Sequence, residues 1–234
     1  MPASARAIGM NALVLAACLA AWTVVLQPTS RLLWPMLCGG TVDATVQATL
    51  LLNPPVFILG AWAAMVVAMM SPVLLATARR RVVEASLAEV ALFLTAYGAG
   101  WMVAGAGLFA VALLAASAKL SPAGALMLGM AAVGLWQASP ARQQCLNLCH
   151  RIGARRATAG TTGGAFAAGS AYAAGCVGAT WPLMLAALAA PDWHLAAMLI
   201  ATAWMVSDRL EPPSRPTWRW RWPGRGAWRA MARA

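Results

Sequence analysis

Long apolar stretches separated by short polar loops form the hydrophobic pattern of this chain. Six of them are long enough for a membrane crossing, because a helix rising ~1.5 Å per residue needs about 17–25 residues to traverse the hydrocarbon layer. The predicted spans are residues 8–26, 55–78, 87–116, 121–137, 160–188 and 192–208. The pattern therefore predicts an all-α, polytopic membrane protein with six transmembrane helices in one bundle.

Basic residues orient these spans. If the N-terminus is inside, all of the 17 Lys and Arg residues except Arg31 and Lys119 face the cytoplasm. This is the positive-inside bias of a bacterial inner-membrane protein, and it predicts that both termini are cytoplasmic.

Composition agrees with a membrane location. The chain is 62% hydrophobic and 10% charged, and one bundle over residues 1–210 leaves no room for a soluble catalytic domain. We attribute the net charge of +11 to loops and a tail, residues 211–234, that face anionic lipid, and we expect no nucleic-acid partner.

The fifth span is rich in small residues. Six glycines, among them Gly169, Gly175 and Gly178, allow neighbouring backbones to approach closely. We expect this span at the centre of the bundle, with the third span, which carries Gly100 and Gly105, pressed against it.

Two spans carry soft sulfur donors. Met65 and Met69 are four residues apart in the second span, and Cys176, Thr180 and Met184 follow at four-residue steps in the fifth. Thioether and thiolate sulfur prefer Cu(I), and thioethers need no buried charge. Methionine also fills gaps in apolar cores, and for the Met pair alone we favour that interpretation.

A third cluster follows the fourth span. Ser139 and Pro140 suit an N-cap and a first helical residue, so a short cytoplasmic helix is predicted to begin there. On it Cys145 and Cys149 lie one turn apart, with His150 adjacent. These donors suit Cu(I) or Zn(II), and two reduced cysteines at the membrane surface are the alternative. From the span ends we expect this cluster about 15 Å from Cys176, which predicts two separate metal sites.

No arrangement typical of an enzyme is present. The predicted spans hold no carboxylate pair, no Ser/His/Asp set and no phosphate-binding glycine loop. The sequence therefore predicts a non-catalytic protein.

Together these segments resemble a family of bacterial predicted metal-binding integral membrane proteins, classed as a domain of unknown function. The resemblance covers about residues 62–210. It rests on Trp62-x-x-Met65-x-x-Ala68-Met69-Met70-x-Pro72, Tyr97-x-x-x-Trp101, Gln137-x-Ser139-Pro140-x-Arg142-x-x-Cys145-Leu146-x-x-Cys149, Cys176-x-Gly178-x-x-Trp181-x-Leu183-Met184 and Asp208-Arg209. The resemblance implies copper handling or delivery.

The chain departs from the family pattern at several positions. It has Ala179 and Thr180 in place of two adjacent cysteines, His150 in place of an arginine and Trp193 in place of a methionine. What remains of the intramembrane donors is Cys176 and three methionines, which favours a weak or transient Cu(I) site.

The tail alternates aromatic and cationic residues. The alternating residues are Trp218, Arg219, Trp220, Arg221, Trp222 and Trp228. Tryptophan prefers the membrane interface and arginine prefers lipid phosphate, so we favour contact with the inner leaflet. A docking strip for other membrane-protein subunits is the alternative.

Two functions stay open from the sequence. One is a copper-binding, copper-chaperone-like membrane protein that uses the Met and Cys clusters. The other is a non-catalytic accessory subunit of a respiratory, photosynthetic or oxygenase complex with a degenerate metal site. Retention of Cys145, Cys149 and the Met pair favours the first.

Overall fold

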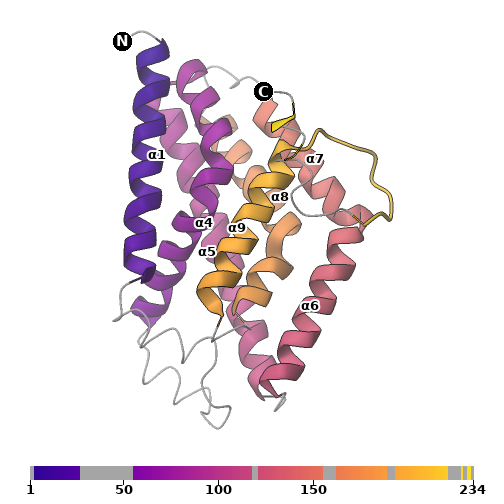
Figure 1. Ribbon diagram of the computed structural model, residues 1–234. Coiled ribbons are helices and arrows are strands. Elements are labelled where there is room, and N and C mark those ends of the chain that lie inside the picture. Colours follow the sequence, from indigo (N-terminus) through magenta and orange to yellow (C-terminus); the bar gives the residue numbers. More distant parts are fainter. Residues whose placement is uncertain are drawn as a thin grey trace.

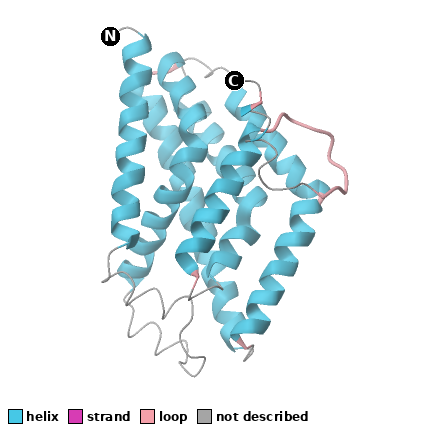
Figure 2. Ribbon diagram, in the orientation of Figure 1, coloured by secondary structure: helices cyan, strands magenta, loops and turns pink. Residues whose placement is uncertain are grey.

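The structure is a computed structural model that describes residues 3–26, 55–117, 121–154, 162–188, 193–220, 228 and 231–232. The helices lie side by side in one bundle, and the described residues contain no strand (Figures 1 and 2). The helices are α1 Ala3–Leu26, α4 Pro55–Glu84, α5 Leu87–Ser117, α6 Pro122–Ala138, α7 Pro140–Ala154, α8 Thr162–Leu188 and α9 His194–Leu210. The predicted all-α class is confirmed.

Four helices are long and apolar enough to cross a membrane. Their apolar segments are Ile8–Leu26 of α1, Pro55–Leu75 of α4, Leu87–Val111 of α5 and Gly163–Leu188 of α8. Helices α6 and α9 have 17 residues each, which gives about 26 Å against the ~30 Å of a typical hydrocarbon layer. The prediction of crossings is therefore supported for four of the six spans, and α6 and α9 stay predictions.

Helix α8 is the centre of the bundle, as the glycine pattern predicts. It packs against α5, α6, α7 and α9. A Cβ atom at Gly100 of α5 would lie 2.6 Å from the Cβ of Ala173, and one at Gly169 of α8 would collide with the carbonyl oxygen of Phe93. The missing side chains therefore allow α5 and α8 to touch along their backbones.

Helices α6 and α7 follow one another along α8 (Figure 1). The Ser139 hydroxyl accepts the backbone N–H of Arg142 at 3.1 Å, so α7 begins with the predicted cap. The Trp136 indole of α6 donates to the carbonyl of Gly178 at 2.8 Å. A Cβ atom at Gly178 would lie 2.6 Å from the sulfur of Cys145, which places α7 directly against the next turns of α8.

The segment after α9 returns to the α6–α7 junction. Asn147 of α7 donates its amide to the carbonyl of Ser214 at 2.8 Å and accepts the Ser214 backbone N–H at 3.3 Å. Arg219 donates its backbone N–H to the carbonyl of Ala138 at 3.0 Å, which satisfies a carbonyl at the end of α6. The tail is thus held across this junction by backbone and amide contacts.

The contact between α5 and α8 leads to a first prediction. Gly169→Ala should lower the free energy of unfolding by about 1–3 kcal/mol, because the new methyl group overpacks the backbone of α5 at Phe93. The midpoint of thermal unfolding in detergent, followed by circular dichroism, measures this. The control is Gly163→Ala on the same helix, where no atom lies within 4 Å and alanine favours the helix. Equal unfolding midpoints for Gly169→Ala and Gly163→Ala would contradict the close packing of α5 and α8.

Candidate functional site

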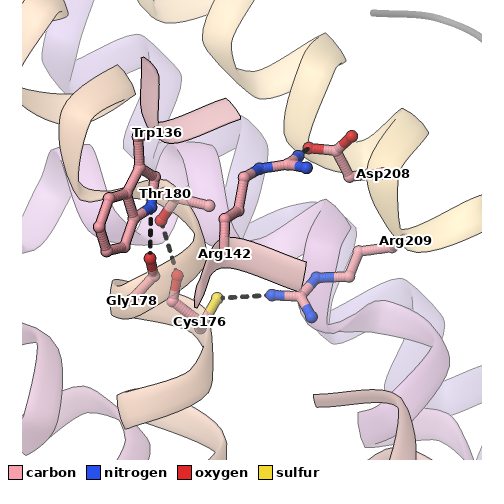
Figure 3. A network of polar contacts seen from close by, with 7 residues as sticks. All are labelled: Trp136, Arg142, Cys176, Gly178, Thr180, Asp208 and Arg209. Carbon is pink, nitrogen blue, oxygen red and sulfur yellow. Dashed lines mark hydrogen bonds and ion pairs between the residues drawn. The ribbon is translucent and has the colours of Figure 1, made fainter. Parts of the chain in front are cut away.

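The thiol of Cys176 is fully buried in the middle of α8. Arg209 near the end of α9 donates its Nη2 to the sulfur at 3.1 Å (Figure 3). The hydroxyl of Tyr97 on α5 lies 3.4 Å from the same sulfur. One turn later, Thr180 donates its hydroxyl to the Cys176 carbonyl at 2.8 Å. The sulfur therefore meets polar groups from two other helices.

A second thiol lies near the same guanidinium. Cys149 is buried on α7, and the Arg209 charge acts on its thiol. The Cys149 sulfur lies 3.8 Å from the carbonyl oxygen of Tyr172. The α7 and α8 thiols thus share one cationic neighbour.

This arrangement corrects the sequence prediction of two clusters about 15 Å apart. Helix α7 lies against Tyr172–Gly178 of α8, and a Cβ atom at Gly175 would be 2.8 Å from the Cys149 sulfur. The prediction treated α7 as a helix beyond the end of the fifth span. The glycines instead let it pack against the turns that carry Cys176.

The guanidinium of Arg209 lies over one ring of an aromatic cluster. Arg209 lies over the ring of Tyr172 at 5.6 Å from the centroid, and that ring packs against Phe93 and Tyr97. Thr77 of α4 donates to the Tyr172 hydroxyl at 3.2 Å. A cation on an aromatic face is stabilised more strongly when it is shielded from water, as here.

Helix α7 lies outside the four candidate spans, and its ionisable groups respond to burial. Burial raises the pKa of Cys149 to about 12, although the nearby Arg209 charge opposes this, and it also raises the pKa of Cys145. Burial and then Arg209 lower the pKa of His150. At neutral pH the metal-free protein therefore holds a thiol at Cys149 and a neutral imidazole at His150.

A buried ion pair lies beside the thiols. Arg142 of α7 donates to the carboxylate of Asp208 on α9, and the Arg142 side chain is fully buried (Figure 3). Arg142 Nε and Nη1, Arg209 Nη1 and both amide atoms of Gln137 have no hydrogen-bond partner among the described residues. Two guanidinium groups therefore accompany one carboxylate in this region.

The predicted methionine ligands lie in the core. Met65, Met69 and Met184 are fully buried, and so are Met198 and Met205 on α9, which were not among the predicted ligands. Their spacing of seven residues, with Ala201 between them, is a helical signal that was available. Among the described residues, no three His, Cys, Asp or Glu side chains are close enough to form a metal-binding group.

Arg209 and Tyr172 were not among the predicted site residues. Arg209 was visible only as half of the Asp208-Arg209 pair, and Tyr172 had no local signal. Their role depends on how α5, α8 and α9 meet, which is a tertiary property.

The predicted lipid- or partner-binding residues are on the surface where the structure describes them. Trp218 and Trp228 are about 70% exposed, Arg219 is exposed, and Trp220 is 44% exposed and packs near Gly134 of α6. Arg221 and Trp222 lie outside the described residues.

Comparison with known proteins identifies the family. Residues 59–228 match the model of a family described as PpoB2, copper chaperone. No curated protein and no solved structure matches the chain. The match spans 170 of 234 residues (59 through 228) and includes all the buried thiols and methionines described above. The chain therefore belongs to the PpoB2 copper chaperone family.

Proposed function

We propose that this chain is a non-enzymatic, multi-pass membrane protein that binds copper as Cu(I) and delivers it to another protein. The observation that carries this proposal is the set of buried sulfur atoms in a chain of a copper chaperone family. Cysteine thiolate and methionine thioether are soft donors that select Cu(I).

The depth of the sulfur atoms favours a monovalent, weakly hydrated ion. Met65, Met69 and Met184 are fully buried and uncharged, so they do not incur the desolvation cost of buried carboxylates. Uncharged thioether donors suit weak binding and transfer. Cys145, Cys149, His150 and Cys176 would supply the stronger donors.

For the membrane topology we propose six crossings in a bacterial inner membrane, with both termini in the cytoplasm. The N-terminal end of α1 and the C-terminal end of α9 lie at the same end of the bundle, which supports this (Figure 1). Helices α6 and α9 are a few ångströms short of a typical hydrocarbon layer, a mismatch that local thinning of the bilayer accommodates.

The topology predicts where a reporter enzyme that works only in the periplasm becomes active. Fusions after Arg81, after Arg156 or at the C-terminus should be silent, and fusions near Asp43 or Lys119 should be active. Reporter activity, divided by the amount of fusion protein, measures this. An active C-terminal fusion would overturn the six-crossing topology.

The copper proposal predicts retention of Cu(I) by the purified protein. The full chain in detergent, loaded with Cu(I) without oxygen, should keep copper through a desalting column, as measured by elemental analysis. Replacing Met65, Met69 and Met184 with leucine should lower the retained copper, because leucine preserves core volume but removes the sulfur. The control replaces the exposed Met127 and Met130 in the same way. Wild-type protein that retains no copper would rule out the copper proposal.

For the tail we propose contact with the anionic inner leaflet, worth ~1 kcal/mol per arginine near the surface. An accessory subunit that docks through the tail is the second candidate. It is favoured by the exposure of Trp218 and Trp228, since tryptophan is the commonest anchor of protein interfaces.

Native-gel migration of mild detergent extracts separates these two candidates. Trp218→Ser with Trp228→Ser should leave migration unchanged, because lipid contact is spread over many tail residues. The control is Trp193→Ser, which is equally exposed at the start of α9. A high-mass band that is lost only in the tail variant would favour the accessory subunit instead.

A further inference from the structure

We infer that Cys149 and Cys176 together hold one Cu(I) ion as a two-coordinate bis-thiolate, and that Arg209 is the positioning residue which neutralises its negative charge. This inference rests on the proposed copper function and names the site that performs it.

The geometry brings the two thiols to the same turn of α8 from different helices. Arg209 Nη2 contacts the Cys176 sulfur at 3.1 Å, and the Cys149 sulfur lies 3.8 Å from the carbonyl oxygen of Tyr172, one turn before Cys176. Gly175 leaves room for the Cys149 sulfur against the backbone of α8. Both thiols are free and buried, so neither forms a disulfide and neither is exposed to solvent.

Charge explains why an arginine lies here. Asp208 is paired with Arg142, and no carboxylate is paired with Arg209 in the part of the chain that the structure describes. A partly buried cation without a counter-ion is unfavourable, so this region stabilises an anionic occupant. Two thiolates and one Cu(I) ion carry a net charge of −1, which the Arg209 charge of +1 cancels.

The binding step is balanced without a redox partner. Cu(I) and two thiols give a Cu(I) bis-thiolate and two protons, and the protons leave to solvent. Two Cu–S bonds form, two S–H bonds break, and copper keeps its oxidation state.

Other nearby donors fit this ion less well. Cys145 lies against Gly178, one turn before Cys149 on α7, and is only partly buried, whereas Cys149 and Cys176 are buried. The hydroxyl of Tyr97 lies 3.4 Å from the Cys176 sulfur and acts as a polar neighbour, since oxygen is a poor ligand for Cu(I). Two-coordinate binding also agrees with the absence of any group of three His, Cys, Asp or Glu donors among the described residues.

The first experiment measures which atoms hold copper. Full-length protein in mild detergent is loaded with Cu(I) without oxygen and titrated with the Cu(I) chelator bathocuproine disulfonate. Copper X-ray absorption then counts the sulfur neighbours. We expect two Cu–S bonds in the wild type, and we expect Cys149→Ser and Cys176→Ser each to lose the chelator-resistant copper. The control is Cys18→Ser on α1, whose thiol lies against the carbonyl of Ala68 and should not affect binding.

The second experiment tests Arg209. Arg209→Gln should weaken Cu(I) binding by about 10- to 100-fold, as loss of a group that supports a metal ligand does, while the two Cu–S bonds persist. Arg209→Lys should restore most of the affinity because it restores the charge. Arg151→Gln, an exposed position on α7, is the control and should bind as the wild type does. If Arg209 only supported the fold, Arg209→Lys would not restore the Cu(I) affinity while leaving the copper X-ray absorption spectrum as in the wild type.

The outcomes separate this inference from the function it rests on. Wild-type protein that binds no Cu(I) overturns the copper function. Three or more sulfur neighbours of Cu(I) in the wild type would overturn the two-thiol site but not the copper function. Unchanged Cu(I) binding after Cys149→Ser would do the same. Because the sulfur count is measured on the wild type, it decides the matter even if a cysteine variant fails to fold.

Discussion

The close approach of α7 to α8 is the constraint on which the candidate site depends. Gly175 and Gly178 have no side chain, and the space is filled by the sulfur atoms of Cys149 and Cys145. A Cβ atom at Gly175 or Gly178 would lie 2.8 or 2.6 Å from one of these sulfur atoms, so a larger residue would displace α7 from α8. Small residues pack helices in many membrane proteins, but here they also determine the position of two thiols.

Buried charge then determines which side chains can lie beside those thiols. Arg142 at the start of α7 is fully buried and pairs with Asp208, which ties α7 to α9. Removing either partner would leave an uncompensated charge in the protein, a loss that typically exceeds the net value of the pair itself. Arg209, the next residue of α9, instead contacts the Cys176 sulfur on α8. Among the described residues, the one ion pair of this region leaves the second guanidinium without a carboxylate.

The fold and the site were predictable to different degrees. Apolar length and the cap at Ser139 predicted the helices closely, because both are local properties of the chain. The central place of α8 followed from its glycines. Span length alone leaves the crossings of α6 and α9 as predictions, and counting from span ends placed Cys149 too far from Cys176. That count assumed helices of equal depth, whereas α6 ends partway along α8 and α7 packs against the remaining turns.

The packing of α7 against α8 changes what the departures from the family pattern imply for the metal site. Ala179 and Thr180 replace the adjacent cysteines that the resemblance implies, and both are buried on α8. Thr180 uses its hydroxyl to bond the Cys176 carbonyl one turn earlier, so it is satisfied within its own helix. A site made only from α8 would have lost most of its thiols through these replacements. A site that takes one thiol from α8 and the other from α7 keeps both donors, and the replacements leave the Arg209 contact intact.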